Sequence, residues 1–537
     1  MRKLYCNGDF IPMTGEEDTF EALVVEDGVI AFTGDLADAE EMFPDAEKID
    51  VDGAAVMPGF VDGHSHFLGG YQMVTQADLG ACRSFSQIQD TLRTFMEQNQ
   101  IGPDGVLLGT NYDQNELEEG HHPDKFVLDQ VSTEVPIYIS HVSSHMGAAN
   151  SKALEVCGIT SETPDPEGGR FGRVEGTAEP NGFIEEVSAV MQMTVPLVGR
   201  MKVDQREVYR KVQDIYLSHG ITTCQDGASV GVLLANVMPL VEEGLFDLDI
   251  VGYPMLGMDK DEVCERYGSY MGREYHNHFR FGGLKQVLDG SPQGRTAWMS
   301  EPYTPGDEGE GWCAYPALTD EQVIAHCKEA IDGGYQLLTH TNGDAASEQL
   351  LRCYKEAYDA SDNPRKDELR PVMIHCQTTR RDQYERMGGF NMIPSIFTSH
   401  IWFWGDAHLK NFGPERGSRI SAVRDAVECG LVYNFHTDCP IVPPDMLHTV
   451  WCAANRVTKG GAQLDERQKV SVYEGLKGIT INAAYAYYEE DAKGTLEVGK
   501  LADLVLLDKN PLKVDPMEVR DISVLETVKE GETVWKR

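Results

Sequence analysis

The segment "PGFVDGHSHF", residues 58–67, sets two histidines directly after a short apolar run. Side chains alternate along a strand, so His64 and His66, which are two residues apart, point to the same side. Two imidazoles on one side of a strand end can bind one metal ion. A single histidine is more often structural, and this pair taken alone leaves a metal site and a structural role equally open.

Downstream of this segment the chain repeats a helix, a glycine and a short apolar strand. In residues 319–322, "TDEQ" has the spacing of a capping box with Thr319 as the N-cap, and Gly333-Gly334 ends the helix before "YQLLTH". "REVYRKVQDIYLSHG" followed by "ITTCQD", and "SRISAVRDAVECG" followed by "LVYNFHTD", repeat this order. The alternation predicts parallel strands with crossover helices, and over about 430 residues it favours a (β/α)8 barrel with insertions over an open sheet.

The two ends of the chain have a different pattern, with short strand-like runs separated by turns. Asp27-Gly28, within "FEALVVEDGVIAFTGD", is a two-residue hairpin signal, and "GKLADLVLLDKNP" near the other end also gives a short strand broken by a turn. We predict one small β domain from residues 1–56 plus 490–537, and a barrel from residues 57–489. Residues 161–182 are rich in Gly, Pro and Glu, which predicts a long loop or lid on the barrel.

Composition excludes several classes of partner. The 46 basic and 87 acidic residues give a formal net charge of −41, which argues against nucleic acid and anionic lipid as partners. The N-terminal segment has no apolar signal region, and no apolar run approaches the roughly 20 residues that span a bilayer, so we expect a cytoplasmic protein with no membrane partner. The 12 cysteines are scattered without a Cys-x-x-Cys pair, which suits reduced thiols.

Further polar residues lie at other predicted strand ends. His340 in "QLLTHTNGD" and His375 in "RPVMIHCQ" each end a short apolar run, so four strand-end histidines lie on three strands. Asp438 ends "LVYNFHTD", where a carboxylate can bind metal and accept a proton from water, although a turn aspartate is the alternative. Lys285 lies within the apolar strand "FRFGGLKQVLDG". It either extends its ammonium to the rim or, as a neutral amine, reacts with carbon dioxide to give a carbamate that bridges two metal ions.

The order of these segments resembles a known family. "PGFVDGHSH", "LKQVLDGSPQGRTA", "LLTHTNGDAA", "VMIHCQ", "HTDCPIVPPDML" and "GTLEVGKLADLVLLD" resemble the metal-dependent amidohydrolase superfamily. More narrowly, they resemble its YtcJ-like branch, also called amidohydrolase family 3, which includes N-substituted formamide deformylase. "NYDQNELEEGHHPDKFVLDQV", "SSHMGAANSKALEVCGI" and "ITINAAYAY" match the same branch, so the resemblance spans nearly the whole chain.

This resemblance implies an α/β fold, a distorted (β/α)8 TIM barrel with a small β-sandwich domain formed by both chain ends. It implies that His64 and His66 bind the more buried metal with Asp438, and that His340 and His375 bind a second metal. Lys285, carboxylated on its side-chain nitrogen, would bridge the two ions. The branch implies two Zn²⁺ most often, although these ligands also accept Mn²⁺, Fe²⁺ or Co²⁺.

Two segments depart from the pattern of this branch. "IHCQ" stands where relatives tend to have Glu-His-Ala-Gln, and His436 stands where a small residue usually precedes the aspartate. Because His436 is two residues from Asp438, it lies on the same strand face. An additional metal ligand, a substrate contact and a packed ring are all compatible with this position.

Candidate substrate contacts come from other segments. In "SHIWFWGDAH", residues 399–408, Trp402 and Trp404 would share a face if the segment were extended. The resemblance places Tyr112, His145 and Arg295 at the barrel mouth. An aromatic stripe is more often core than ligand wall, and a pocket lined by these indoles would suit an aryl or large apolar amine substituent.

The leading functional hypothesis is a hydrolase acting on a carbon–nitrogen bond other than a peptide bond, in a linear or cyclic amide, a formamide or a related small molecule. A metal-bound hydroxide would attack the carbonyl, and Asp438 would accept the proton and pass it to the leaving amine. The alternatives are a mononuclear hydrolase with an unmodified Lys285 and a non-catalytic scaffold of the same fold. The sequence identifies neither the substrate nor the oligomeric state, so a homo-oligomer stays open.

Overall fold

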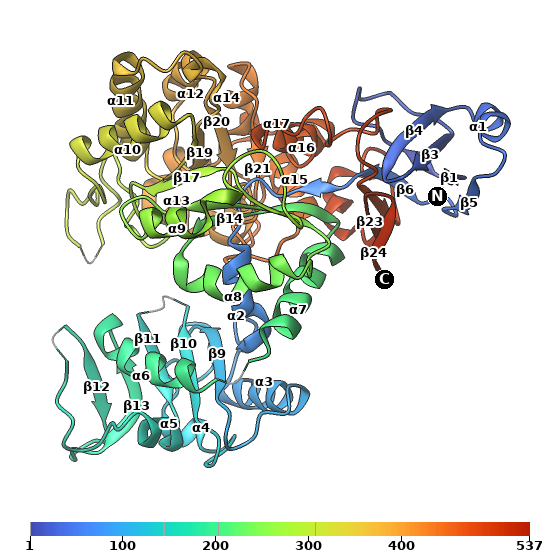
Figure 1. Cartoon of the computed structure of the whole chain (residues 1–537). Helices are drawn as coiled ribbons and strands as arrows, with labels where there is room; N and C mark the ends of the chain where they lie inside the picture. The colour runs from blue at the N-terminus through green and yellow to red at the C-terminus, as the bar shows by residue number, and fades with distance from the viewer. Residues whose placement is uncertain (1, 143–144, 167, 202, 307) are drawn as a thin grey trace. The chain divides into compact units, whose positions relative to one another are not determined.

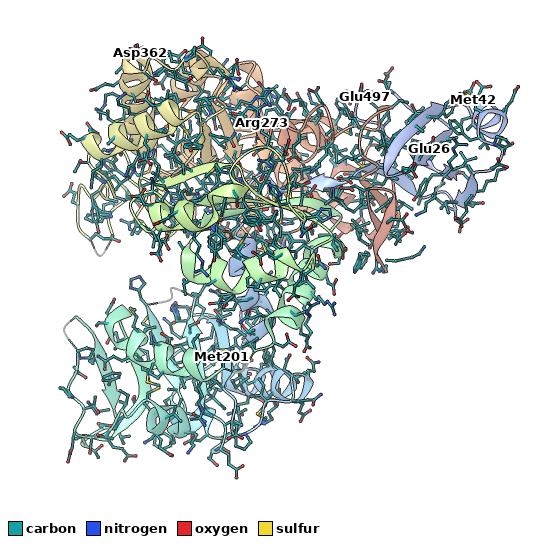
Figure 2. The ribbon with its side chains drawn as sticks, in the orientation of Figure 1. Glu26, Met42, Met201, Arg273, Asp362 and Glu497 are labelled. Carbon is teal, nitrogen blue, oxygen red and sulfur yellow. The ribbon has the colours of Figure 1, made fainter. Side chains whose placement is uncertain are left out.

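The computed structural model describes residues 2–142, 145–166, 168–201, 203–306 and 308–537, and the chain divides into two compact units (Figure 1). Unit 1 comprises Met1–Gly69 and Gln213–Arg537, and unit 2 comprises Gly70–Val212. Figure 2 shows the side chains of Asp362 and Glu497 in unit 1, both of which are exposed and carry part of the acidic excess. Among the helices that the described residues form, none has the length and apolar character needed to cross a membrane.

Two parallel sheets form the centre of unit 1. The first has the order β16-β15-β14-β7 and the second the order β17-β18-β19-β20-β21. Their strands are β7 (Phe60–Val61), β14 (Ile221–Ser229), β15 (Asp249–Pro254), β16 (Phe279–Phe281), β17 (Gly283–Val287), β18 (Gln336–Thr341), β19 (Val372–His375), β20 (Ile393–Ile396) and β21 (Asn434–Phe435). Every neighbouring pair in both sheets is parallel, as the helix–strand alternation predicted.

Backbone contacts also join the two sheets. Met255 and Lys285 form an isolated parallel bridge, and the Gly63 amide donates to the Phe435 carbonyl over 3.1 Å. These contacts bring β15 near β17 and the end of β7 near β21. Closure into a complete (β/α)8 barrel stays a prediction.

Helices alternate with these parallel strands along the chain. They are α7 (Gln205–Ser218), α8 (Gly231–Glu242), α9 (Lys260–Tyr267), α10 (Asp320–Gly333), α11 (Asp344–Ala360), α12 (Arg381–Met387), α13 (His400–Ser418), α14 (Val423–Glu428), α15 (Met446–Asn455), α16 (Val472–Gly478) and α17 (Ile481–Ala486). Helix α10 begins with the predicted capping box: the Thr319 side chain accepts from the Gln322 amide, and the Gln322 side chain accepts from the Thr319 amide. Gly334 follows with a φ of 72°, a left-handed conformation that favours glycine, so both predicted ends of this helix are confirmed.

The two ends of the chain share one sheet, where blue and red strands meet in Figure 1. Strand β6 (Ala55–Pro58) pairs antiparallel with β22 (Leu504–Leu507) in the order β2-β6-β22-β23-β24, with β2 (Asp9–Phe10), β23 (Val524–Lys529) and β24 (Glu532–Lys536). A second sheet, β4-β3-β1-β5, contains β1 (Arg2–Cys6), β3 (Ala22–Glu26), β4 (Val29–Gly34) and β5 (Glu47–Asp50), and helix α1 (Leu36–Met42) follows β4. The Asp27-Gly28 hairpin between β3 and β4 is confirmed. One apolar core contains Phe10, Val56, Leu504 and Val528, while the β-sandwich and its boundaries stay predictions.

A buried ion cluster joins the C-terminal segment to the parallel sheets. Lys493 forms ion pairs with Asp249, at the start of β15, and with Glu489 at 2.7 Å. Asp249 also contacts Lys529 at 2.9 Å and His278 at 2.7 Å. Lys493, Lys529 and Asp249 are each less than 5% exposed, so this cluster lies in the interior. It ties β23 and the segment after α17 to β15.

Unit 2 contains a six-stranded sheet with the order β12-β13-β11-β10-β9-β8. Its strands are β8 (Gln76–Asp78), β9 (Leu107–Tyr112), β10 (Ile137–His141), β11 (Met146–Ala149), β12 (Arg170–Arg173) and β13 (Pro180–Glu185), and its helices are α2 (Tyr71–Thr75), α3 (Phe85–Gln98), α4 (Lys125–Leu128), α5 (Ser151–Val156) and α6 (Val187–Arg200). Residues 161–182 contain β12 and the start of β13, so the predicted long loop is wrong, while a lid role for this segment stays a prediction. Phe171 and Ile184 are buried in a common core, which explains why this Gly- and Pro-rich segment pairs as a hairpin.

Candidate metal centre

The predicted metal ligands all lie in unit 1, on or directly after its parallel strands. They are His64 and His66 after β7, Lys285 within β17, His340 in β18, His375 at the end of β19 and Asp438 after β21. Polar side chains at the carboxyl ends of parallel strands meet at one edge of the sheets, which is where ligand sites of such folds lie. The local sequence explains why these strands form, because each contains apolar residues that are buried in the core.

Gln225, in β14, fixes the orientation of His64. Its Oε1 lies 2.5 Å from His64 Nδ1, while its Nε2 donates to a backbone carbonyl and to the Tyr487 hydroxyl. Because an amide oxygen only accepts, His64 Nδ1 carries the proton and Nε2 presents a lone pair. That Nε2 lies 3.4 Å from Lys285 Nζ and 3.5 Å from Asp438 Oδ1.

The remaining imidazoles form a chain of contacts. His375 Nε2 lies 3.0 Å from His340 Nδ1, and His375 Nδ1 lies 3.2 Å from His436 Nε2. His436 Nδ1 in turn lies 2.9 Å from Ser395 Oγ, which anchors the chain to β20. The strand-end histidines are therefore brought together as predicted, and His436 joins them through a direct contact with His375.

Asp438 places a carboxylate oxygen inside this group. The backbone amide of Asp438 donates to the His64 carbonyl over 3.0 Å, and its φ of 57° turns the chain sharply after β21. Its Oδ1 lies 3.2 Å from His66 Nε2, yet this buried oxygen makes no well-directed hydrogen bond among the described residues. Ligand atoms of His64, His375 and Asp438 all lie within 4.8 Å of one another. This grouping draws on both of the metal sites that the resemblance implies.

Burial controls the charge of the imidazoles. It lowers the pKa of His64 and His375 well below the ordinary value, the pKa of His340 to about 4 and that of His436 to about 3. These rings are therefore neutral at neutral pH. Neutral imidazoles are the form that binds a metal ion.

Lys285 and Asp438 complete the electrostatics of the group. Burial lowers the pKa of Lys285 to about 8, although the charges of Asp438 and Asp226 act in the opposite direction. Burial acts to raise the pKa of Asp438, but contact with His66 and the positive charge of Lys285 act in the opposite direction, and the pKa lies below its ordinary value. An ionised carboxylate oxygen without a well-directed donor, among neutral imidazoles, fits a divalent cation.

The aromatic segment differs from the prediction. Residues 399–408 are not extended, because His400–Ser418 form α13. Side chains two positions apart on a helix point about 200° apart, so Trp402 and Trp404 do not share a face. Trp402 contacts Trp451 with ring centroids 5.3 Å apart, whereas Trp404 contacts His400 at 4.4 Å. The predicted shared indole wall is therefore wrong.

The other predicted substrate contacts, Tyr112, His145 and Arg295, each have partners within their own unit. Tyr112 and His145 lie in unit 2, where the Tyr112 hydroxyl lies 3.1 Å from His122 Nδ1 and His145 Nδ1 lies 3.1 Å from a carboxylate oxygen of Glu186. Arg295 lies in unit 1, and its guanidinium pairs with Glu308 at 2.9 Å and donates to a backbone carbonyl. Substrate roles for these residues stay predictions.

Several residues that support the group were not singled out from the sequence. Gln225 and Ser395 hold the imidazoles of His64 and His436, as described above. Asp62 accepts hydrogen bonds from the amide and the hydroxyl of Thr437, at 3.1 and 2.6 Å, which ties the end of β7 to the Asp438 turn. The available signal was a polar residue inside or directly after an apolar strand, which Gln225 and Asp62 both show.

Comparison with known proteins gives concordant matches. The model of a family described as "Amidohydrolase family" matches residues 47–535. The chain is 26% identical to the putative amidohydrolase YtcJ of Bacillus subtilis (strain 168), covering 100% of both chains, and 25% identical to N-substituted formamide deformylase of Arthrobacter pascens, covering 96% of this chain and 95% of that protein. An uncharacterised metal-dependent hydrolase from Pyrococcus horikoshii OT3 has a similar fold, with a TM-score of 0.77 and 24% identity over 96% of this chain and 99% of that one.

Proposed function

The chain belongs to the amidohydrolase family, and from this premise we propose that it hydrolyses a carbon–nitrogen bond in an amide, a formamide or a related small molecule. Family membership and the similarity to named hydrolases support a metal-dependent hydrolase at the coarser level. The narrower substrate class rests on N-substituted formamide deformylase, which is similar over nearly the full length of both chains. Under this proposal the imidazole group of unit 1 is the active site.

The residues of this group would hold the metal. We assign His64, His66 and Asp438 to one divalent cation and His340 and His375 to a second, both most simply Zn²⁺, with Lys285 as a carboxylated bridge. A bound divalent cation polarises a carbonyl and lowers the pKa of water enough to give a nucleophile near neutral pH. The observation that carries this assignment is Asp438 Oδ1, a buried carboxylate oxygen beside two histidines that makes no well-directed hydrogen bond within the described residues.

Asp438 is the residue placed to move protons. Its depressed pKa keeps the carboxylate ionised at neutral pH, so Oδ1 can accept a proton from the attacking water and return it to the leaving nitrogen. Gln225 holds His64 in the tautomer whose Nε2 faces Asp438, and Asp62 holds the turn that carries Asp438. Their burial keeps bulk water away from these hydrogen bonds.

One observation favours a single-ion version of the same chemistry. Ligand atoms of His64, His375 and Asp438 already lie within 4.8 Å of one another, which suits one cation shared by three ligands. Lys285 would then remain an unmodified amine, 3.4 Å from His64 Nε2. The two versions differ in metal content and in the effect of replacing Lys285.

The direct test is amine release from a panel of N-substituted formamides and amides by the metal-loaded protein. We expect at least one substrate to be turned over, and Asp438→Asn to lower kcat by about 10²–10⁴-fold. Asp445→Asn is the matched control, because Asp445 caps α15 and asparagine caps equally well. Turnover by Asp438→Asn at the parent rate would exclude Asp438 as the base.

A further inference from the structure

A second cavity lies in unit 1, apart from the metal centre. It has a volume of about 290 Å³ and lies among the segments that follow β17, β18 and β19 and the C-terminal part of α13. Four arginines line it, Arg380, Arg381, Arg416 and Arg419, against the two carboxylates of Glu301 and Asp344. Arginines outnumber acidic side chains in this lining, whereas the chain as a whole has 46 basic and 87 acidic residues. Each of the four arginines also forms an ion pair with an acidic residue.

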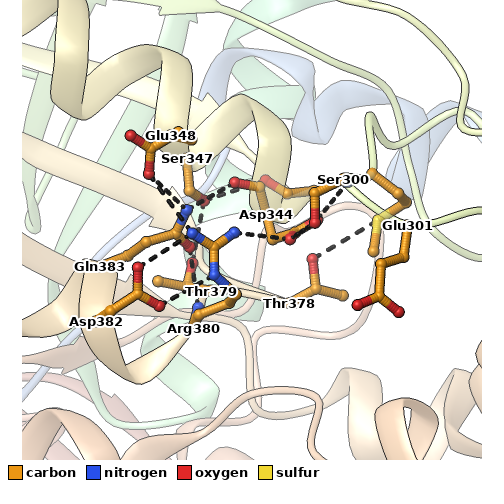
Figure 3. Close-up of polar contacts among 12 residues, drawn as sticks. Ser300, Glu301, Asp344, Ser347, Glu348, Thr378, Thr379, Arg380, Asp382 and Gln383 are labelled. Carbon is orange, nitrogen blue, oxygen red and sulfur yellow. Dashed lines mark hydrogen bonds and ion pairs between the residues drawn. The ribbon is translucent and has the colours of Figure 1, made fainter.

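The carboxylate of Asp344 already has hydrogen-bond and ion-pair partners, which Figure 3 shows. It accepts from the Ser300 amide at 2.8 Å and from its hydroxyl, and it pairs with Arg380 Nη1 at 2.8 Å. Arg380 also pairs with Asp382 at 3.0 Å and approaches Glu348 at 3.6 Å. Arg380 and Asp344 therefore form a closed network that builds the wall of the cavity.

Arg416 and Arg419 are less fully satisfied. Arg416 donates to the backbone carbonyls of Glu301, at 3.0 Å, and Pro302, and its nearest carboxylate among the described residues is that of Glu301 at 3.8 Å. Arg419 uses one nitrogen, Nη2, to donate to Asp425, a carboxylate that it shares with Arg381. Within the described residues, Arg416 Nε and the Nε and Nη1 of Arg419 make no hydrogen bond, so both guanidinium groups retain donors.

The backbone places these two arginines together. Gly413, with a φ of 75°, interrupts α13, and Pro414 follows it, so the last turns of α13 leave the direction of the first. Arg416, in the last turn of α13, and Arg419, directly after its end, lie beyond this kink and are three residues apart. Before the kink, the ring of Phe412 stacks on Tyr303 with centroids 4.9 Å apart and gives the cavity an apolar wall.

We propose that this cavity binds the oxyanion of a small ligand, a carboxylate or a phosphate, through Arg416 and Arg419. Guanidinium groups bind both oxyanions with paired, charge-assisted hydrogen bonds. The volume is close to the lower end of the roughly 300–1,000 Å³ of small-molecule sites, so the ligand is a small metabolite and not a polymer. None of the assigned metal ligands lines the cavity, so the proposal goes beyond the hydrolase activity and does not depend on it.

The test is calorimetric titration of the metal-loaded protein with inorganic phosphate and, separately, with succinate, at an ionic strength held constant with sodium chloride. We expect at least one probe to bind, and its Kd to rise about tenfold or more in Arg416→Gln and in Arg419→Gln. The probe that binds distinguishes a phosphate ligand from a carboxylate ligand. Arg365→Gln is the matched control, because Arg365 forms an exposed ion pair with Glu368 elsewhere and should leave Kd unchanged.

Two results would overturn the proposal. The first is that neither probe binds the parent protein. The second is that a probe binds the parent and both arginine variants with the same Kd, because its binding site would then be the metal centre or another part of the protein. Thermal unfolding of each variant establishes that it is folded. If Arg416→Gln does not fold, Arg416→Lys keeps the charge and removes the two-pronged geometry, and a Kd equal to the parent's would again contradict the proposal.

Discussion

Lys493→Met tests how the C-terminal segment is held to the parallel sheets. The substitution keeps the apolar stem of a side chain that is 4% exposed and removes an ammonium between Asp249 and Glu489. Breaking a buried ion pair by removing one partner costs about 3–5 kcal/mol, because a charge is left buried. Here Asp249 keeps Lys529 at 2.9 Å and Glu489 keeps Arg280 at 2.8 Å, so we expect the lower end, a loss of about 3 kcal/mol.

The measurement is the free energy of unfolding from urea titration, followed by circular dichroism. Lys355→Met is the control, since Lys355 pairs with Asp359 on the exposed face of α11 and its loss should cost less than about 1 kcal/mol. The reasoning would be refuted if the two variants lost the same stability. A more stable Lys493→Met would show that methionine packing outweighs the ion cluster.

Two further substitutions test other interactions in unit 1. His278→Gln removes an imidazole whose pKa is raised by its hydrogen bond to Asp249. Because the pKa is higher in the folded protein, protonation stabilises the fold below the unfolded pKa of about 6.5. This stabilisation is lost as the pH rises through the folded pKa. We therefore expect a loss of about 1 kcal/mol at pH 6 that shrinks by pH 9, and equal losses at both pH values would contradict this. Gly343→Ala places a Cβ 1.8 Å from the Trp298 carbonyl oxygen, so urea titration should show that the free energy of unfolding falls by about 3 kcal/mol. Gly389→Ala is the control, because its Cβ would have no atom within 4 Å and the free energy of unfolding should hardly change.

Local signals were sufficient for much of the fold of unit 1. The capping box at Thr319 and the left-handed Gly334 set both ends of α10, because each depends on residues within one turn. The Asp27-Gly28 turn likewise fixed a hairpin whose strands are adjacent in sequence. The helix–strand alternation then required parallel strands, since a crossover helix returns the chain to the same edge of the sheet.

The sequence was least informative where partners are distant or patterns are ambiguous. Alternating aromatic letters around Trp402 and Trp404 resemble a strand, but the segment forms a helix that places the two side chains against different neighbours. The contact between His64 and Gln225 joins residues 161 positions apart, so no local pattern contains it. The sheet of unit 2 mixes parallel and antiparallel pairs of short strands, and such registers are set by tertiary packing.

The central claim is that the buried imidazoles and Asp438 hold divalent metal. Elemental analysis of metal per chain, on the folded parent and on Lys285→Ala purified in parallel, tests it most directly. We predict about two ions per chain in the parent and fewer in the variant, as a bridged pair requires, whereas one ion unaffected by the substitution would select the single-ion version. A folded parent protein that retains no divalent metal after incubation with Zn²⁺ and removal of the excess would contradict the claim.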